Sequence, residues 1–125
     1  TSNWEKCLNC KAFMRKNKIE NLKDIQVYFT NIIASRIKEK RRIAIVWEDA
    51  MGEKLNKDIV IMIWKGRGIE AINKALQGGH NIILSPQKPM YFDHYQFKDR
   101  KKQPIAFGGF NPLKSVYSYS PKKNL

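Results

Sequence analysis

The sequence lacks several features that define common protein classes. Its 125 residues contain no apolar run approaching the roughly 18 residues of a membrane-spanning helix. Two cysteines are too few for a disulfide-rich scaffold, and no repeat with a period of roughly 20–50 residues is present. The first twenty residues are polar and basic and lack the apolar stretch of a signal peptide. We therefore expect no membrane span, no disulfide framework and no repeat array.

Acidic residues are also scarce, and the position of the excess positive charge bears on function. The chain holds 24 Lys and Arg against 11 Asp and Glu, a formal net charge of +13. Residues 1–42 hold 11 basic and 4 acidic side chains (+7), residues 43–96 hold 6 and 6, and residues 97–125 hold 7 and 1 (+6). A nucleic-acid-binding domain more often carries its basic residues on the folded framework, with aromatics interleaved. We therefore expect no nucleic acid partner. A basic nucleic-acid-binding or other non-enzymatic binding module is the alternative function.

Apolar residues make up 42% of the chain, enough for the core of one small domain. Their spacing predicts an amphipathic helix over 22–40 that buries one apolar stripe. The stripe consists of Leu22, Ile25, Tyr28, Phe29, Ile32, Ile33 and Ile37. A second helix is predicted over 68–77, because Gly78 and Gly79 follow as a stop signal.

Three short apolar runs predict strands near 43–47, 59–64 and 81–84, and the first two are predicted to be buried on both faces as in a parallel sheet. Strands alternating with helices predict an α/β fold. Only the 11 residues 48–58 separate the first two strands, whereas a parallel crossover usually has a dozen or more. The connecting helix is then a single turn, or this pair is not a standard βαβ unit.

Beyond residue 86, prolines and glycines predict a long C-terminal loop region. Three strands cannot close a barrel, and alone they would leave two exposed sheet edges. Residues 1–125 are therefore predicted to be a fragment of a larger α/β fold.

Candidate binding residues follow the predicted strands. Trp47 and Trp64 each end a strand, and the carboxyl ends of parallel strands form the active-site face of α/β folds. Indoles there give flat apolar walls that suit sugar rings, although both side chains are equally compatible with a core role. The loop after the third strand, residues 91–96, is rich in hydrogen-bonding groups and is a candidate polar binding loop, or an ordinary loop anchored by aromatics.

Six motifs taken in order resemble the later part of the catalytic barrel of family 20 glycoside hydrolases, the β-N-acetylhexosaminidases. They are Val46-Trp47-Glu48-Asp49, Ile63-Trp64-Lys65-Gly66, Gly79-His80-Asn81-Ile82-Ile83, Tyr91-Phe92-Asp93-His94-Tyr95-Gln96, Gly108-Gly109 and Val116-Tyr117-Ser118-Tyr119-Ser120-Pro121. The segment from Trp4 to Cys10 also resembles a Trp-Glu-Lys-Cys-x-x-Cys segment of bacterial members. Nearly the whole chain is covered.

The resemblance implies a partial TIM (β/α)₈ barrel and hydrolysis of terminal N-acetylhexosamine residues of glycans by substrate-assisted retaining catalysis. It implies that Tyr91 hydrogen-bonds the acetamido oxygen that attacks the anomeric carbon. Asp93 would accept a hydrogen bond from a sugar hydroxyl, and Trp47 and Trp64 would wall the pocket. No metal or cofactor is implied. Relatives are often periplasmic or secreted, and the sequence leaves the compartment open.

The chain departs from the family pattern at three points. The catalytic Asp-Glu pair of the His-x-Gly-Gly-Asp-Glu motif is absent, together with the remainder of the barrel. Lys65 stands where the family has Arg, and Glu48-Asp49 reverses the family's Asp-Glu order; these two acids match strand-end acids, not the acid catalyst. Because the general acid is missing, we expect the isolated chain not to hydrolyse hexosaminides.

The cysteines and histidines are expected to lie outside the catalytic machinery. Cys7 and Cys10 resemble half a zinc site or a redox pair. The only other sulfur or imidazole donors, His80 and His94, are far away in the sequence, and no strand is predicted before Cys7, which favours a structural or incidental role. His80 is predicted to cap a helix–strand turn, and His94 replaces a family tyrosine.

Overall fold

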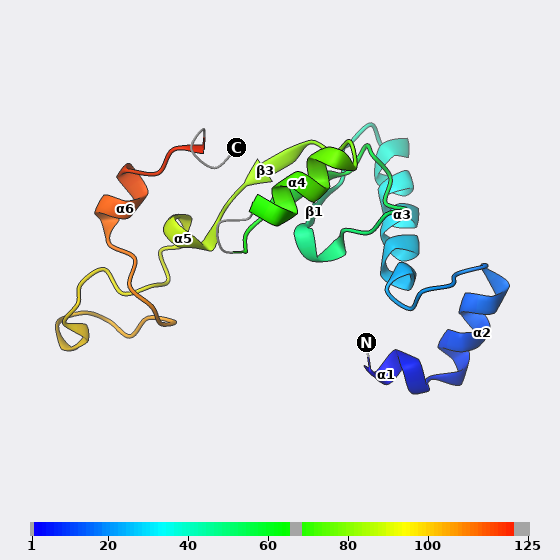
Figure 1. Ribbon diagram of the computed structural model, residues 1–125, viewed down its shortest axis with the longest axis horizontal. Coiled ribbons are helices and arrows are strands. Elements are labelled where there is room, and N and C mark those ends of the chain that lie inside the picture. The colour runs from blue at the N-terminus through cyan, green and yellow to red at the C-terminus, as the bar shows by residue number, and fades with distance from the viewer. Residues whose placement is uncertain (1, 66–68, 122–125) are drawn as a thin grey trace.

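A small parallel sheet with helices against one face forms the centre of the computed structural model, which describes residues 2–65 and 69–121 (Figure 1). The described strands are β1 (Ile45–Trp47), β2 (Val60–Ile63) and β3 (Ile82–Leu84), ordered β1-β2-β3 and all parallel. The predicted α/β fold with a parallel sheet is confirmed.

The two crossovers differ in length. The connection between β1 and β2 contains a three-residue 3₁₀ helix, η1 (Glu48–Ala50). Of the two alternatives that the sequence left open, a connecting helix of a single turn is the one observed. Between β2 and β3 runs the helix α4 (Ile69–Gln77). The predicted start of α4 at residue 68 lies outside the described residues. Gly79, at φ +78°, follows its end, and the backbone N–H of His80 donates to the Ala75 carbonyl at 3.0 Å. This is the glycine-terminated end that the sequence predicts.

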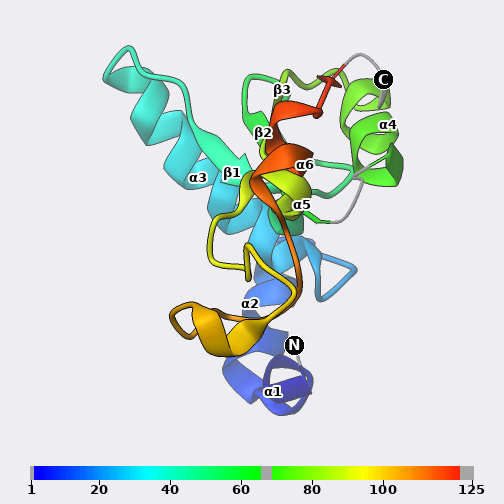
Figure 2. The same ribbon diagram turned by 90° about the vertical axis from the view of Figure 1, so that its left-hand side faces the viewer.

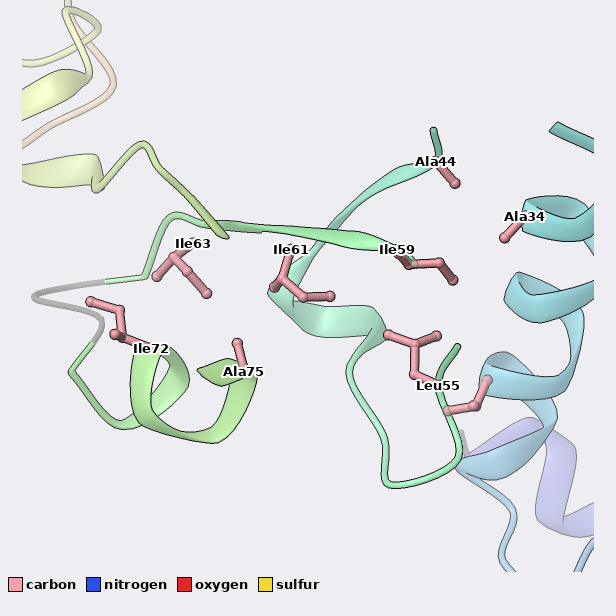
Figure 3. Packing of buried hydrophobic residues seen from close by; sticks show 9 residues of the cluster. Ala34, Ala44, Leu55, Ile59, Ile61, Ile63, Ile72 and Ala75 are labelled. Atoms are coloured by element: carbon pink, nitrogen blue, oxygen red, sulfur yellow. The ribbon is translucent and has the colours of Figure 1, made fainter. Parts of the chain in front are cut away.

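The core lies between the sheet and the helices α3 (Asp24–Glu39) and α4 (Figure 3). Ile59, Ile61 and Ile63 alternate along β2 and its approach, and each is almost completely buried. Val27 and Ala34 of α3 and Ile72 and Ala75 of α4 pack on the same face together with Ala44 and Leu55. Burying one such isoleucine stabilises the fold by about 1.5–3 kcal/mol.

The prediction that the first strand is buried on both faces is wrong. Ala44 and Val46 point toward the helices, but Ile45 and Trp47 point to the other face and are 53% and 48% exposed. Successive side chains of a strand point to opposite faces, and the described part of the chain covers only one face of the sheet. The continuous apolar run of β1 therefore gives the sheet a second apolar face, which the described residues leave uncovered.

The apolar stripe of α3 is also misplaced by the sequence pattern. The buried residues are Val27 and Ala34, whereas Phe29, Ile32 and Ile33 are 63%, 45% and 43% exposed. At 3.6 residues per turn, Ile32 lies about 140° around the helix from Val27. The helix is thus apolar on two sides, and the smaller residues face the sheet because the backbones approach closely there.

Close approach at α3 is visible at Gly52, in the connection between β1 and β2. A Cβ atom added to Gly52 would lie 2.5 Å from Cγ2 of Val27, so a larger residue does not fit there. One turn further along, Asn31 holds the same connection: its Nδ2 donates to the Lys54 carbonyl at 2.8 Å, and its Oδ1 accepts from the Asn56 N–H at 2.9 Å.

Two peripheral regions extend from this centre. The N-terminal helices α1 (Ser2–Lys6) and α2 (Leu8–Lys16) form an arm below α3, with Phe13 stacked edge-on against Tyr28 at 5.5 Å (Figures 1 and 2). The C-terminal region is the predicted long loop region, and it also contains short helical turns that the sequence pattern does not predict. These are α5 (Gln87–Met90), η2 (Arg100–Lys102) and α6 (Leu113–Tyr117). None of the described helices is long and apolar enough to cross a bilayer.

Candidate active site

An aromatic cavity lies at the carboxyl ends of the strands. Trp47 ends β1, Trp64 directly follows β2, and Tyr91 lies beyond β3, after α5. With Asp49 of η1, these three side chains line a cavity of about 240 Å³. The fold therefore brings together three of the four residues that the sequence singles out, from three separate segments of the chain.

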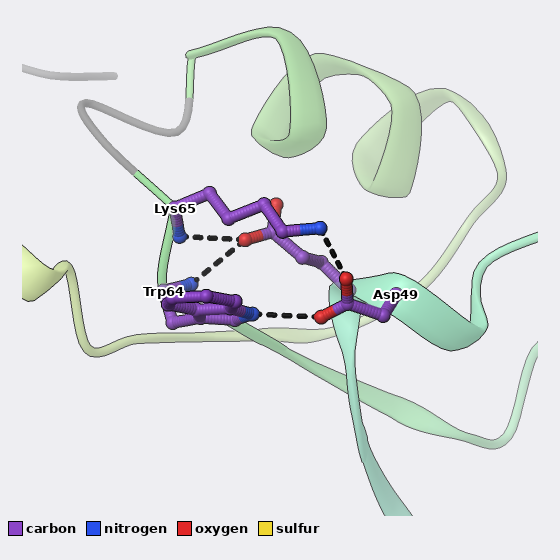
Figure 4. A network of polar contacts seen from close by, with 4 residues as sticks. Asp49, Trp64 and Lys65 are labelled. Atoms are coloured by element: carbon purple, nitrogen blue, oxygen red, sulfur yellow. Dashed lines mark hydrogen bonds and ion pairs between the residues drawn. The ribbon is translucent and has the colours of Figure 1, made fainter.

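Asp49 fixes the indole of Trp64 within this cavity (Figure 4). Its Oδ2 accepts a hydrogen bond from Nε1 of Trp64 at 2.7 Å, and its Oδ1 forms an ion pair with Nζ of Lys65. The Lys65 ammonium lies 5.4 Å from the centre of the Trp64 ring, a cation–π contact. The Lys65 ammonium and, next, the Trp64 indole N–H lower the pKa of Asp49, so this carboxyl group is ionised at neutral pH. The Asp49 carboxylate in turn raises the pKa of Lys65.

Glu48 fixes the backbone on which Trp64 stands. This side chain is buried, and its Oε1 accepts hydrogen bonds from the backbone N–H of Trp64 at 3.1 Å and from the backbone N–H of Lys65 at 2.6 Å. Hydrogen bonds to an ionised carboxylate are stronger than those between neutral groups. Trp64 is therefore held twice, through its backbone by Glu48 and through its indole by Asp49.

Asp93 lies apart from this cavity. Its side chain is 50% exposed, and it is not among the residues that line the cavity. Its Oδ1 lies 3.4 Å from Nδ1 of His94, whose ring is buried against Gly109 and whose Nδ1 has no well-aligned hydrogen bond. The structure thus brings Trp47, Trp64 and Tyr91 together, and Asp93 lies at the surface of the adjoining loop.

Asn111 positions the Tyr91 segment and was not anticipated from the sequence. It is 2% exposed, and its Nδ2 donates to the carbonyls of Pro89 and Tyr91, each at 2.9 Å. Its own N–H donates to the Tyr95 carbonyl at 2.9 Å. An asparagine before a proline is a common turn signal, so the sequence offers a reason to expect a turn but none to expect a buried clamp.

The two histidines stand in structural surroundings. Nδ1 of His80 lies 3.0 Å from the Ile59 carbonyl, in the turn between α4 and β3. Across residues 2–65 and 69–121, no three His, Cys, Asp or Glu side chains gather as a metal site would require.

Three parallel strands with helices on one face and a cavity at their carboxyl ends define an α/β protein. The model of the glycosyl hydrolase family 20 catalytic domain matches residues 1–125, and the chain belongs to this family.

Similar proteins agree with this assignment. A β-hexosaminidase of Porphyromonas gingivalis is 31% identical in an alignment of 121 positions that covers 94% of this chain and 15% of that protein. The crystal structure of a family 20 exo-β-N-acetylglucosaminidase from Vibrio harveyi in complex with N-acetylglucosamine matches with 28% identity and a TM-score of 0.76, over 94% of this chain and 18% of that one. A β-N-acetylhexosaminidase of Bacteroides fragilis matches with 28% identity and a TM-score of 0.71, over 95% and 25%. The chain therefore spans about a quarter or less of the length of these relatives.

Proposed function

We propose that this chain is the later part of the catalytic barrel of a β-N-acetylhexosaminidase, which releases terminal N-acetylhexosamine residues from glycans. Family membership over residues 1–125 supports the reaction class. The observation that carries the proposal is the cavity lined by Trp47, Asp49, Trp64 and Tyr91 at the carboxyl edge of the sheet. Its two indoles and one phenol offer apolar faces for a sugar ring and a hydrogen-bond donor for an amide oxygen.

The proposed roles follow from the chemistry of these groups. In substrate-assisted retaining catalysis the acetamido oxygen of the substrate attacks the anomeric carbon while the glycosidic oxygen leaves. The hydroxyl of Tyr91 would donate to that acetamido oxygen and hold it in line with the carbon. Trp47 and Trp64 would enclose the N-acetyl group and ring, and Asp93 would accept from a sugar hydroxyl. Holding the reacting atoms in line accounts for a large part of catalysis in intramolecular reactions.

The general acid is not among these residues. No Gly-Gly-Asp-Glu sequence occurs in the 125 residues, and both Glu48 and Asp49 are engaged by donors of the next strand end. General acid catalysis contributes about 10²–10⁴-fold in rate. We therefore expect the acid to come from a segment outside these 125 residues, and the isolated chain to be inactive.

Two uncovered apolar surfaces support packing against such a segment, the remainder of the barrel. One is the open sheet face with Ile45 and Ile83, and the other is the outer face of α3 with Phe29 and Ile33. Contiguous exposed apolar surface in a folded chain marks an interaction site.

A chimera tests the proposal. In the chimera, this chain replaces the segment of the Porphyromonas gingivalis β-hexosaminidase with which it aligns. The assay measures hydrolysis of a chromogenic N-acetyl-β-glucosaminide. We expect an active chimera, and a loss of kcat of about 10²-fold or more for Tyr91→Phe in it. Tyr28→Phe, which removes a phenol that donates to Asn17 Oδ1 at 2.9 Å on the far side of the fold, is the matched control. A folded chimera in which both variants keep full kcat would contradict the role of Tyr91, and turnover by the isolated chain would contradict its inactivity.

The alternative, a basic nucleic-acid-binding module, makes a separate prediction. The logarithm of its binding constant for duplex DNA would fall linearly with the logarithm of the salt concentration, and the slope would report the number of phosphate contacts. We expect no such binding at physiological salt.

A further inference from the structure

The junction between α1 and α2 brings the two cysteines of the chain together at a helix start, at the end of the molecule away from the sheet (Figures 1 and 2). Cys7 is the N-cap of α2, in extended conformation, and its Sγ accepts the backbone N–H of Cys10 at 3.2 Å. Residues three apart on a helix are neighbours on its surface. Both thiols are free and only partly buried, so reagents in solution can reach them.

The surroundings favour a negative charge on Cys7. The first turn of α2 directs its free N–H groups toward the cap, and the helix dipole adds a positive partial charge there. In the sequence, Lys6 adjoins Cys7, Lys11 follows it by four residues, and Glu5 is the one acidic residue nearby. A cap position at a helix N-terminus is an environment in which cysteine thiols become reactive.

The two thiols differ from one another. The hydrogen bonds from the Cys10 thiol and backbone N–H lower the pKa of Cys7. The same thiol–thiol hydrogen bond, with some desolvation, raises the pKa of Cys10. Cys7 is therefore the better nucleophile of the two at a given pH, and Cys10 is the candidate resolving cysteine.

We propose that Cys7 and Cys10 form a reversible dithiol–disulfide pair that exchanges with low-molecular-weight disulfides, with Cys7 as the nucleophile. The Cys7 thiolate attacks one sulfur of the disulfide, a mixed disulfide forms on Cys7, and the first small thiolate leaves. Cys10 then loses its proton to solvent and attacks Sγ of Cys7, so the Cys7–Cys10 bond forms and the second small thiolate leaves. Two protein thiols are oxidised and one small disulfide is reduced to two thiols.

A zinc site is the competing use of the same two sulfurs. A structural zinc needs four ligands, and in the part of the chain that the structure describes no cluster of three His, Cys, Asp or Glu side chains occurs. The nine-residue helix α2 also contributes no further donor besides Cys10.

The experiment equilibrates the chain in mixtures of reduced and oxidised glutathione, followed by acid quench, alkylation and mass spectrometry. For the unaltered chain we expect loss of two hydrogens without a stable glutathione adduct, reversed by excess reduced glutathione. Cys10→Ser keeps a hydroxyl at the resolving position and is expected to accumulate one glutathione on Cys7. Cys7→Ser is expected to react at least tenfold more slowly at pH 7, and in urea the two variants should react at equal rates.

Three outcomes would overturn the proposal. Two separate glutathione adducts on the unaltered chain would show that the thiols do not pair. Equal rates for the two folded variants would remove the nucleophilic role of Cys7. Stoichiometric zinc on the purified chain that protects both thiols would assign them to a metal.

Discussion

The two faces of the sheet differ although the strands contribute apolar residues to both. On the face toward α3 and α4, Ile61 is completely buried and Ile59 and Ile63 are nearly so. On the other face, the neighbouring positions Ile45 and Trp47 remain about half exposed. The difference teaches that apolar strand composition does not by itself report burial, because β1 carries apolar side chains on both faces and the described residues cover only one of them. The same open face carries Trp47, one wall of the aromatic cavity, so the uncovered face of the sheet is also the side of the proposed chemistry.

Core truncation gives the largest expected contrast between the two faces. Ile61→Ala removes a completely buried side chain and is expected to lower the free energy of unfolding by about 2–5 kcal/mol, because a cavity remains. Ile45→Ala, on the open face, is the matched control and should cost less than about 1.5 kcal/mol, in proportion to the area that it buries. Urea unfolding followed by circular dichroism measures both. Equal losses would mean that the open face is covered in solution, for example by a second copy of the chain.

A glycine substitution tests how closely α3 approaches the sheet on the buried side. Gly52→Ala places a Cβ 2.5 Å from Cγ2 of Val27 and is expected to destabilise the chain by about 1–3 kcal/mol through overpacking. Adding Val27→Ala makes room, so the double variant should lose less than the sum of the two single variants. Strict additivity in urea unfolding would refute the contact.

The polar clamp on the same side gives a smaller effect. Asn31→Ala removes two hydrogen bonds to the 54–56 segment, to the Lys54 carbonyl and from the Asn56 N–H. We expect a loss of about 1–2 kcal/mol, since each neutral hydrogen bond contributes about 0.5–1.5 kcal/mol. Faster hydrogen exchange at Asn56 should accompany the loss. Asn73→Ala, at an exposed position of α4, is the control. Because alanine has the higher helix propensity, this variant should not destabilise the chain, and an equal change in both variants would mean that the hydrogen bonds of Asn31 add no stability.

The fold was predictable where local chemistry decides it. The apolar runs of β1, β2 and β3, the Gly78-Gly79 stop of α4 and the single-turn connection at η1 each follow from a few neighbouring residues. The inward face of α3 was not predictable. The periodicity of apolar residues is dominated by the larger side chains, whereas the close approach of the backbones selects the smaller Val27 and Ala34.

The candidate site divides in the same way. Trp47 and Trp64 were predictable from their positions at strand ends, and Tyr91 from a motif. The clamp by Asn111 depends on contacts between residues about 20 apart that no pattern encodes. The link from Asp49 to Trp64 also depends on the parallel register of β1 and β2, which places the two strand ends side by side.

The smallest expected effect concerns the pH dependence of that link. Lys65 and the Trp64 indole lower the pKa of Asp49 in the folded chain. The ionised Asp49 therefore stabilises the fold fully at pH values above its ordinary pKa of 3.8. This stabilisation is lost as the pH falls through the lower pKa of the folded chain. Because the Asp49 and Lys65 side chains are 46% and 54% exposed, solvent screening limits the contribution to less than about 1 kcal/mol. Asp49→Asn keeps an acceptor for the indole but removes the charge, so the free energy of unfolding should depend less on pH below pH 5. Asp58→Asn, which removes the surface ion pair with Lys38, is the control and should not alter the tryptophan signal. Tryptophan fluorescence in a pH titration, measured in a Trp4→Phe, Trp47→Phe background that leaves Trp64 as the one indole, reports the change at Trp64. An unchanged acid transition in Asp49→Asn would show that the network orders the cavity but adds no stability to the fold.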